Sequence, residues 1–174
     1  MDKDLERSLR LHAAIAANAR DLLAYLERRV EVREDAADLL GETMLVAWRR
    51  LGKLPEPPSE ERMWLFGIAR TTLLNYRRGR RRQLAIAETL RAELTIERAP
   101  EAEGLSLDIR RAIGQLPDDL AELVRLVHWD GFSLADAAEL TGIPAATART
   151  RYSRARARLR ELLPAYDGST TNTR

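Results

Sequence analysis

Arginines at helical spacing are the first feature of the sequence whose residue types could do chemistry. Between Pro144 and Leu163, a helix would stack four polar side chains on one face: Thr147, Arg151, Arg154 and Arg158. Arginines of this kind contact DNA phosphates, while residues at the helix start can reach base edges in the major groove. The residues placed for base contacts are Ala145, Ala146, Thr147, Arg149 and Thr150. The alternative is an ordinary solvated arginine face, and the motif around the helix favours DNA binding.

The residues before this helix have the spacing of a helix-turn-helix. Ser133 and Asp136 can form a capping box, in which each side chain accepts a hydrogen bond from the other residue's backbone amide. Gly142 lies where a turn favours a residue without a Cβ, and Pro144 suits the first turn of the next helix. The face of that helix predicted to be buried consists of Ala148, Tyr152, Ala155 and Leu159. Together these features predict two helices joined by a tight turn.

A second cluster of arginines lies between Trp64 and Gln83, near one side of a predicted helix. Its members are Arg70, Arg77, Arg78, Arg80, Arg81 and Arg82. This density attracts a polyanion, whereas the favourable dipole at a helix C-terminus explains only two or three of the arginines. Asn75 could donate to and accept from a base, or it could be inert on an exposed helix. Trp64 is more typical of a core residue than of a base-stacking platform.

Acidic residues line one side of a helix predicted from Glu34 to Leu51. Apolar residues at three- and four-residue steps predict its buried face, namely Leu40, Met44, Ala47, Trp48 and Leu51. Asp35, Asp38 and Glu42 fall on the side opposite Trp48. Taken alone, such a stripe is more typical of a solvated face than of a partner site.

Helical patterns cover most of the chain and predict an all-α fold of two small helical domains joined by a linker, the second a helix-turn-helix domain. The predicted parts are a first domain at 1–83, an acidic linker at 84–106, a second domain at 107–164 and a disordered tail at 165–174. Predicted helices of the first domain cover about 9–30, 34–51 and 59–82, with a proline-rich loop at 53–61. Those of the second domain cover about 107–116, 117–129, 133–140 and 144–163.

Composition excludes several classes of function. The 174 residues include no cysteine, which removes disulfides, thiolate metal sites and cysteine nucleophiles and fits a reducing cytosol. Basic residues number 29 against 27 acidic ones, so charge is informative only as a local pattern. Short apolar stretches and the start MDKDLERSLR indicate neither a membrane span nor a signal peptide. No glycine-rich phosphate loop or metal cluster occurs, so no cofactor is predicted.

The order of these motifs resembles the extracytoplasmic-function, or group IV, sigma factors of bacterial RNA polymerase. The helix EDAADLLGETMLVAWRRL resembles region two of that family, and WLFGIARTTLLNYRRGRRR resembles its arginine-rich helix that engages the −10 promoter element. GFSLADAA and TARTRYSRARARLR resemble region four, which binds the −35 element. The resemblance covers about residues 22–163. It implies an alternative sigma factor, not an enzyme, that binds core polymerase and directs it to specific promoters.

The resemblance also implies partners and site residues. Those expected to bind the β′ clamp helices of the polymerase are Asp35, Asp38, Glu42 and Thr43. Those expected at the −10 element are Arg70, Asn75, Arg77, Arg78, Arg80 and Arg81. Those expected at the −35 element are Ala145, Ala146, Thr147, Arg149, Thr150, Arg151, Arg154 and Arg156. Contact with the polymerase β flap, an anti-sigma inhibitor and a cytoplasmic, nucleoid-associated location are further expectations.

Three other classes of protein stay open from the residues alone. A conventional helix-turn-helix repressor or activator explains the second half of the chain but leaves the arginines at 77–82 without a role. An enzyme would use His12 or His128 for acid-base chemistry, but neither has partners at useful spacing, and a structural role suits His128 better. A helical adaptor that binds no nucleic acid leaves the arginine clusters unexplained.

Overall fold

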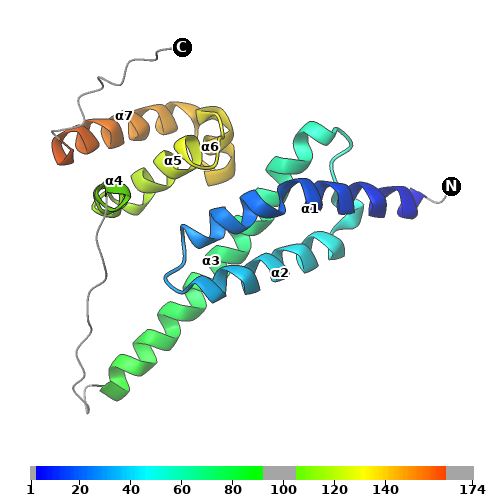
Figure 1. Cartoon of the computed structure of the whole chain (residues 1–174), viewed down its shortest axis with the longest axis horizontal. Coiled ribbons are helices and arrows are strands. Elements are labelled where there is room, and N and C mark those ends of the chain that lie inside the picture. The colour runs from blue at the N-terminus through cyan, green and yellow to red at the C-terminus, as the bar shows by residue number, and fades with distance from the viewer. Residues whose placement is uncertain (1–2, 92–104, 164–174) are drawn as a thin grey trace. The chain divides into compact units, whose positions relative to one another are not determined.

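A computed structural model of the chain describes residues 3–91 and 105–163. Every regular element within these two ranges is a helix, which confirms the predicted all-α fold (Figure 1). The chain divides into two compact units, Met1–Glu97 and Arg98–Arg174. Most of the predicted acidic linker and the predicted tail lie outside the described residues.

The first unit is a three-helix arrangement with a short 3-10 turn. Its elements are α1 (Lys3–Glu27), α2 (Arg33–Arg49), η1 (Leu51–Lys53) and α3 (Pro58–Arg91). Each of the three long helices packs against the other two, with α1 and α2 side by side across α3 (Figure 1). Leu22 and Leu26 are fully buried between them, and the ring of Tyr25 meets Phe66 edge-on with centroids 5.3 Å apart. Apolar burial of this kind supplies most of the stability of such helices.

The buried face of α3 follows the apolar residues that recur at three- and four-residue steps along its sequence. Leu65, Ile68, Ala69, Thr72 and Leu73 are buried, whereas Tyr76 is only half-buried. Trp64, predicted as core, is also half-buried. The helix continues to Arg91 and so passes the end of the first domain predicted at residue 83.

The buried face of α2 differs from the prediction. The residues that pack inward are Ala36, Leu39, Thr43 and Ala47. Trp48, predicted as core, is 41% exposed, and Leu45 is 58% exposed. Three of the four inward residues are small, which lets α2 approach α1 and α3 closely, and the bulky side chains are turned outward. The prediction that Trp48 is buried opposite the acidic residues is therefore wrong.

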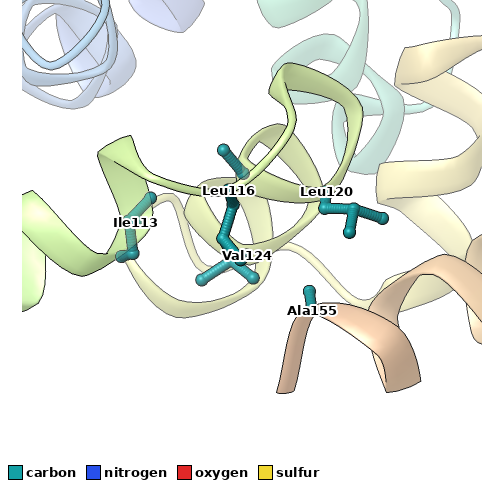
Figure 2. Packing of buried hydrophobic residues seen from close by; sticks show 6 residues of the cluster. Ile113, Leu116, Leu120, Val124 and Ala155 are labelled. Atoms are coloured by element: carbon teal, nitrogen blue, oxygen red, sulfur yellow. The ribbon is translucent and has the colours of Figure 1, made fainter. Parts of the chain in front are cut away.

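The second unit contains α4 (Leu105–Gly114), α5 (Asp118–His128), α6 (Leu134–Thr141) and α7 (Ala145–Leu162). Its core joins α4, α5 and α7 through a cluster that Figure 2 shows from close by. The members of that cluster are Ile113, Leu116, Leu120, Ala121, Val124 and Ala155. Trp129 and Leu159 pack against it from the edge and are partly buried. The predicted burial of Ala155 is confirmed.

Both ends of α6 have the predicted chemistry, the capping box at its start and the glycine turn at its end. The Ser133 Oγ accepts from the Asp136 amide at 3.1 Å, and the Ser133 amide donates to the Asp136 Oδ2 at 3.2 Å, so the capping box is complete. Gly142 has φ +69°, a left-handed conformation that costs glycine little. Pro144 directly precedes α7. The helix-turn-helix prediction is confirmed.

We expect Ser133→Ala to lower the stability of the second unit by about 1 kcal/mol, because the first turn of α6 loses its cap. Hydrogen exchange of α6 amides in the full chain measures the effect, as protection should fall by about fivefold. Ser153→Ala on the exposed side of α7 is the matched control and should leave α6 protection unchanged. Equal protection in the two variants would contradict a role for the cap.

Candidate nucleic-acid interface

The outward face of α7 carries a dense positive charge. Ala148 and Ala155 are completely buried on the inward face, so packing fixes which side of the helix meets solvent. The exposed residues of the helix include Ala145, Ala146, Arg149, Thr150, Arg154, Arg156, Arg158 and Arg160. Up to Arg160 the helix contains no acidic residue. The structure therefore places small residues at the N-terminal end of the face and cations along the rest, the arrangement required to approach DNA.

Two predicted contact residues of α7 lie at the border of this face. Arg151 is half-buried, and its Nε forms an ion pair with the Asp119 Oδ2 of α5 at 3.3 Å. Thr147 is also half-buried. The positive charge of Arg151 is therefore partly offset inside the protein, and Arg149, Arg154 and Arg156 are the better-exposed cations.

His128 has a structural contact, as the sequence suggested. Its Nε2 lies 2.7 Å from the hydroxyl of Tyr152, and the two rings stack with centroids 6.0 Å apart. This pair joins the end of α5 to the middle of α7. It therefore helps to hold α7 in place.

The arginines of α3 fall into two groups that the sequence could not distinguish. Arg78 and Arg81 are exposed, as are Arg82 and Asn75, whereas Arg70 is half-buried. The Nη2 of Arg77 donates to the Arg29 carbonyl at 3.1 Å. Arg80 is held by carboxylates of the same unit. Only part of the predicted cluster is therefore fully presented to solvent.

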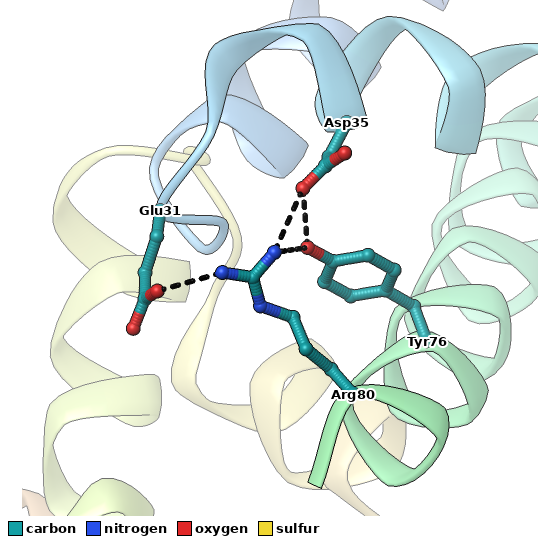
Figure 3. Close-up of polar contacts among 4 residues, drawn as sticks. All are labelled: Glu31, Asp35, Tyr76 and Arg80. Carbon is teal, nitrogen blue, oxygen red and sulfur yellow. Dashed lines mark hydrogen bonds and ion pairs between the residues drawn. The ribbon is translucent and has the colours of Figure 1, made fainter. Parts of the chain in front are cut away.

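Arg80 joins α3 to the start of α2 through the contacts drawn in Figure 3. Its Nη2 lies 3.1 Å from the Glu31 Oε2, and its Nη1 lies 3.4 Å from the Asp35 Oδ2 and 3.2 Å from the Tyr76 hydroxyl. The Tyr76 hydroxyl donates to the same Asp35 oxygen. Asp35 and Arg80, predicted for two different partner surfaces, therefore bind each other. Glu31 and Tyr76 are members that the sequence analysis missed.

Burial raises the pKa of Tyr76 above its ordinary value of 10.0, the hydrogen bond to Asp35 raises it further, and Arg80 opposes the shift. A raised pKa favours the neutral phenol in the folded state. The stabilising contribution of Tyr76 is therefore complete below pH 10 and is lost as pH rises through the shifted pKa.

We expect Tyr76→Phe to lower the free energy of unfolding by about 1 kcal/mol at pH 7. Denaturant unfolding at pH 7, 10 and 11 should show the difference in stability between the wild type and Tyr76→Phe shrinking at high pH. The same pH dependence of stability in both proteins would contradict this.

The outward face of α2 combines carboxylates with apolar surface. Asp38 and Glu42 are exposed as predicted, and Leu45 and Trp48 lie exposed on the same side of the helix. The apolar pair was missed because its spacing suggested core. A face of this composition suits a partner that offers both cations and apolar contacts.

Thr43 does not belong to this surface. It is 0% exposed, and its hydroxyl donates to the Leu39 carbonyl at 2.7 Å. The prediction that Thr43 contacts the polymerase is therefore wrong for this conformation, because the side chain packs between helices.

Across 3–91 and 105–163, no helix is long and apolar enough to cross a membrane. In the same ranges, no group of three or more histidine, aspartate or glutamate side chains could hold a metal ion.

The second unit is a helix-turn-helix whose last helix, α7, is cationic. The first is a three-helix unit that is basic on α3 and acidic on α2. Together they define a two-domain DNA-binding protein. Sigma-70 region 2 matches residues 14–83, and Sigma-70 region 4 matches residues 106–159. The ECF RNA polymerase sigma factor EcfG of Rhodopseudomonas palustris (strain TIE-1) is 34% identical over 74% of this chain and 71% of its own length. The chain belongs to the extracytoplasmic-function sigma factors.

Other relatives agree with this assignment. The ECF RNA polymerase sigma factor SigC of Mycobacterium tuberculosis (strain CDC 1551 / Oshkosh) is 32% identical over 84% of this chain and 79% of its own length. Among solved structures, the sigma factor RpoE in complex with the anti-sigma factor NepR from Bartonella quintana superposes with a TM-score of 0.68 at 28% identity, covering 95% of this chain and 99% of that one. The region 2 match accounts for the first half of the chain, which a conventional repressor or activator leaves unexplained.

The protein is therefore an alternative sigma factor that directs RNA polymerase to promoters. Sigma factors are non-catalytic regulators of transcription initiation.

Proposed function

We propose that the two units divide promoter recognition between them, with the second unit reading duplex −35 DNA and the first capturing the −10 element. The observation that carries this proposal is the distribution of charge on the described helices. The outward faces of α7 and the α3 segment around Arg78 are cationic, whereas Asp38 and Glu42 make the outward face of α2 acidic. DNA and a basic protein surface therefore each have a complementary face.

At the −35 element, α7 would lie in the major groove. The small side chains at its start would contact base edges, and Thr147 and Thr150 would reach bases or phosphates. Arg149, Arg154 and Arg156 would contact phosphates, and Arg151 would do so while remaining near Asp119. The contacts to phosphate supply affinity, and those to bases supply preference for one sequence.

At the −10 element, the first unit would hold a base extruded from the stack. The segment predicted as a loop at 53–61 would receive the base; in the structure its non-helical part is 54–57, between η1 and α3. Exposed cations of α3 would bind the DNA backbone beside it. Extrusion costs a few kcal/mol in lost stacking, which phosphate contacts and the docked polymerase offset. The exposed Arg78 and Arg81 would bind phosphate without losing a contact described above. Arg77 and Arg80 would have to exchange partners inside the protein for phosphate. Arg70 and Asn75 lie earlier on the same helix.

The outward face of α2 would bind polymerase. Asp38 and Glu42 would meet cations of the β′ clamp helices, and Leu45 and Trp48 would add apolar contact.

The second unit would contact the β flap. The acidic segment at 84–106 would act as a linker near the path of the transcript. The same proposal includes an anti-sigma inhibitor, which the complex of RpoE with NepR supports. It also includes a cytoplasmic and nucleoid-associated location and no catalytic activity of the protein's own.

The first test is complex formation between the purified protein and sigma-free bacterial core polymerase, measured by size exclusion. We expect a stable one-to-one complex that transcribes from a cognate promoter. A protein that binds promoter DNA alone and never joins core polymerase would instead be a free-standing regulator.

A further inference from the structure

Arg10 of α1 is joined to the loop that precedes α3. Its Nη2 donates to the carbonyl oxygens of Pro55 and Glu56, the latter at 2.9 Å, and lies 2.7 Å from the Glu61 Oε1. One guanidinium nitrogen therefore meets two backbone carbonyls of the loop and a carboxylate in the first turn of α3. These partners are separated from Arg10 by 45 to 51 residues in sequence.

The loop has few other means of holding its shape. Its first part is fixed by the Lys53 and Leu54 amides, which donate to the Arg50 and Leu51 carbonyls at 2.7 and 3.1 Å. Beyond Leu54, Pro55 and Pro57 of the loop and Pro58 at the start of α3 have no amide hydrogen to donate. Donors for the next carbonyls must therefore come from elsewhere, and Arg10 supplies them.

The contact is also electrostatically specific. Glu61 is only 8% exposed, and a carboxylate at such a depth needs a charged or hydrogen-bonding partner. Leu54 is likewise 8% exposed and anchors the loop from the apolar side. By contrast, Arg7 one turn earlier on α1 forms a longer ion pair, 3.8 Å, with the exposed Asp4. Arg10 therefore binds the stretch of chain between two buried residues, Leu54 and Glu61.

We infer that Arg10 is a positioning residue for promoter opening, holding the loop at Leu54–Pro57 in the shape that receives the extruded base. The inference rests on the proposed capture of a −10 base by this loop. With the loop carbonyls bound to Arg10, the loop loses its conformational freedom when the protein folds and not when DNA binds. The exposed Lys53 and Glu56 are then held at fixed positions along the loop.

The test uses holoenzyme reconstituted from core polymerase and the full chain. A promoter is first selected from a random-sequence DNA pool by the wild-type holoenzyme. Single-stranded oligonucleotides of its non-template −10 segment are then made with one base at a time replaced by an abasic site. For the wild type, we expect one position at which the abasic site weakens binding about tenfold, as the loss of a captured base should.

The variants separate positioning from general damage. Arg10→Met should reduce that base dependence to about twofold or less, while affinity for core polymerase stays within about twofold of wild type. Arg10→Lys keeps a cationic donor and should restore most of the dependence. Arg7→Met removes the same charge from the same helix and should behave as wild type. The double variant Arg10→Met/Glu61→Met frees the loop without leaving a buried unpaired carboxylate, so that the fold is preserved.

The outcomes distinguish the two levels of the proposal. Loss of base dependence in both Arg10→Met variants, with core binding and Arg7→Met unaffected, supports the role of Arg10. Retention of the full tenfold dependence in both variants overturns that role and leaves base capture by the loop standing. A wild type with no abasic-sensitive position overturns base capture itself, and the role of Arg10 with it.

Discussion

Reversing the charge of two residues on α2, in the variant Asp38→Arg/Glu42→Arg, is expected to weaken binding to core RNA polymerase about a hundredfold. Both side chains are exposed and lie beside Leu45 and Trp48, so the change alters the proposed docking face and not the packing of the domain. Two attractive contacts become repulsive ones, and like-charge juxtaposition at an interface costs several kcal/mol. The dissociation constant can be measured by competition with a labelled sigma factor for core polymerase.

A matched control separates this face from the net charge of the protein. Glu6→Arg/Glu60→Arg makes the same change at exposed carboxylates of α1 and α3 and should leave the affinity within about threefold of wild type. Equal losses in the two double variants would show that charge acts at long range and that α2 is not the docking face. Thr43→Ser should also leave binding unchanged, because Thr43 has no exposed surface.

The second large effect concerns α7. We expect Arg149→Ala/Arg154→Ala/Arg156→Ala to weaken holoenzyme binding to duplex −35 DNA roughly a hundredfold at low salt, at about 1 kcal/mol for each lost phosphate contact. The slope of log affinity against log salt should become shallower by about 2 to 3, because each phosphate contact releases close to one counterion. Fluorescence anisotropy across a salt series gives both quantities.

The control for α7 removes three exposed arginines elsewhere, in the variant Arg20→Ala/Arg110→Ala/Arg111→Ala. It has the same net charge as the α7 variant and should bind nearly as wild type. If the two triple variants have the same salt slope, the arginines of α7 make no direct phosphate contacts, and the proposed placement of this helix on DNA is wrong.

Features set by neighbouring residues in sequence could be predicted well. The capping box of Ser133 and Asp136, the left-handed Gly142 and the burial of Ala148 and Ala155 depend on spacings of a few residues, which sequence states directly. The inner face of α3 is of the same kind, since its apolar period in the sequence is unambiguous.

Features set by packing between helices could not be predicted in this way. The buried face of α2 is lined by small residues, so the larger Trp48 and Leu45 dominated the apolar pattern although they face outward. The contact between Asp35 and Arg80 spans 45 residues and depends on how α2 lies on α3. The candidate site was therefore predicted by composition, whereas the division between internally paired and fully presented arginines needed the structure.

The seating of α7 has a consequence for how such a protein can change over time. Its completely buried contacts come from two alanines, Ala148 and Ala155, and none of its most exposed arginines contributes to that packing. Substitutions on the outward face are therefore nearly neutral for folding, as surface substitutions usually are. With α7 docked on DNA as proposed, new promoter preferences would accumulate on this face one residue at a time without passing through unfolded intermediates. The packing of the domain and the promoter sequence that it recognises can then evolve independently.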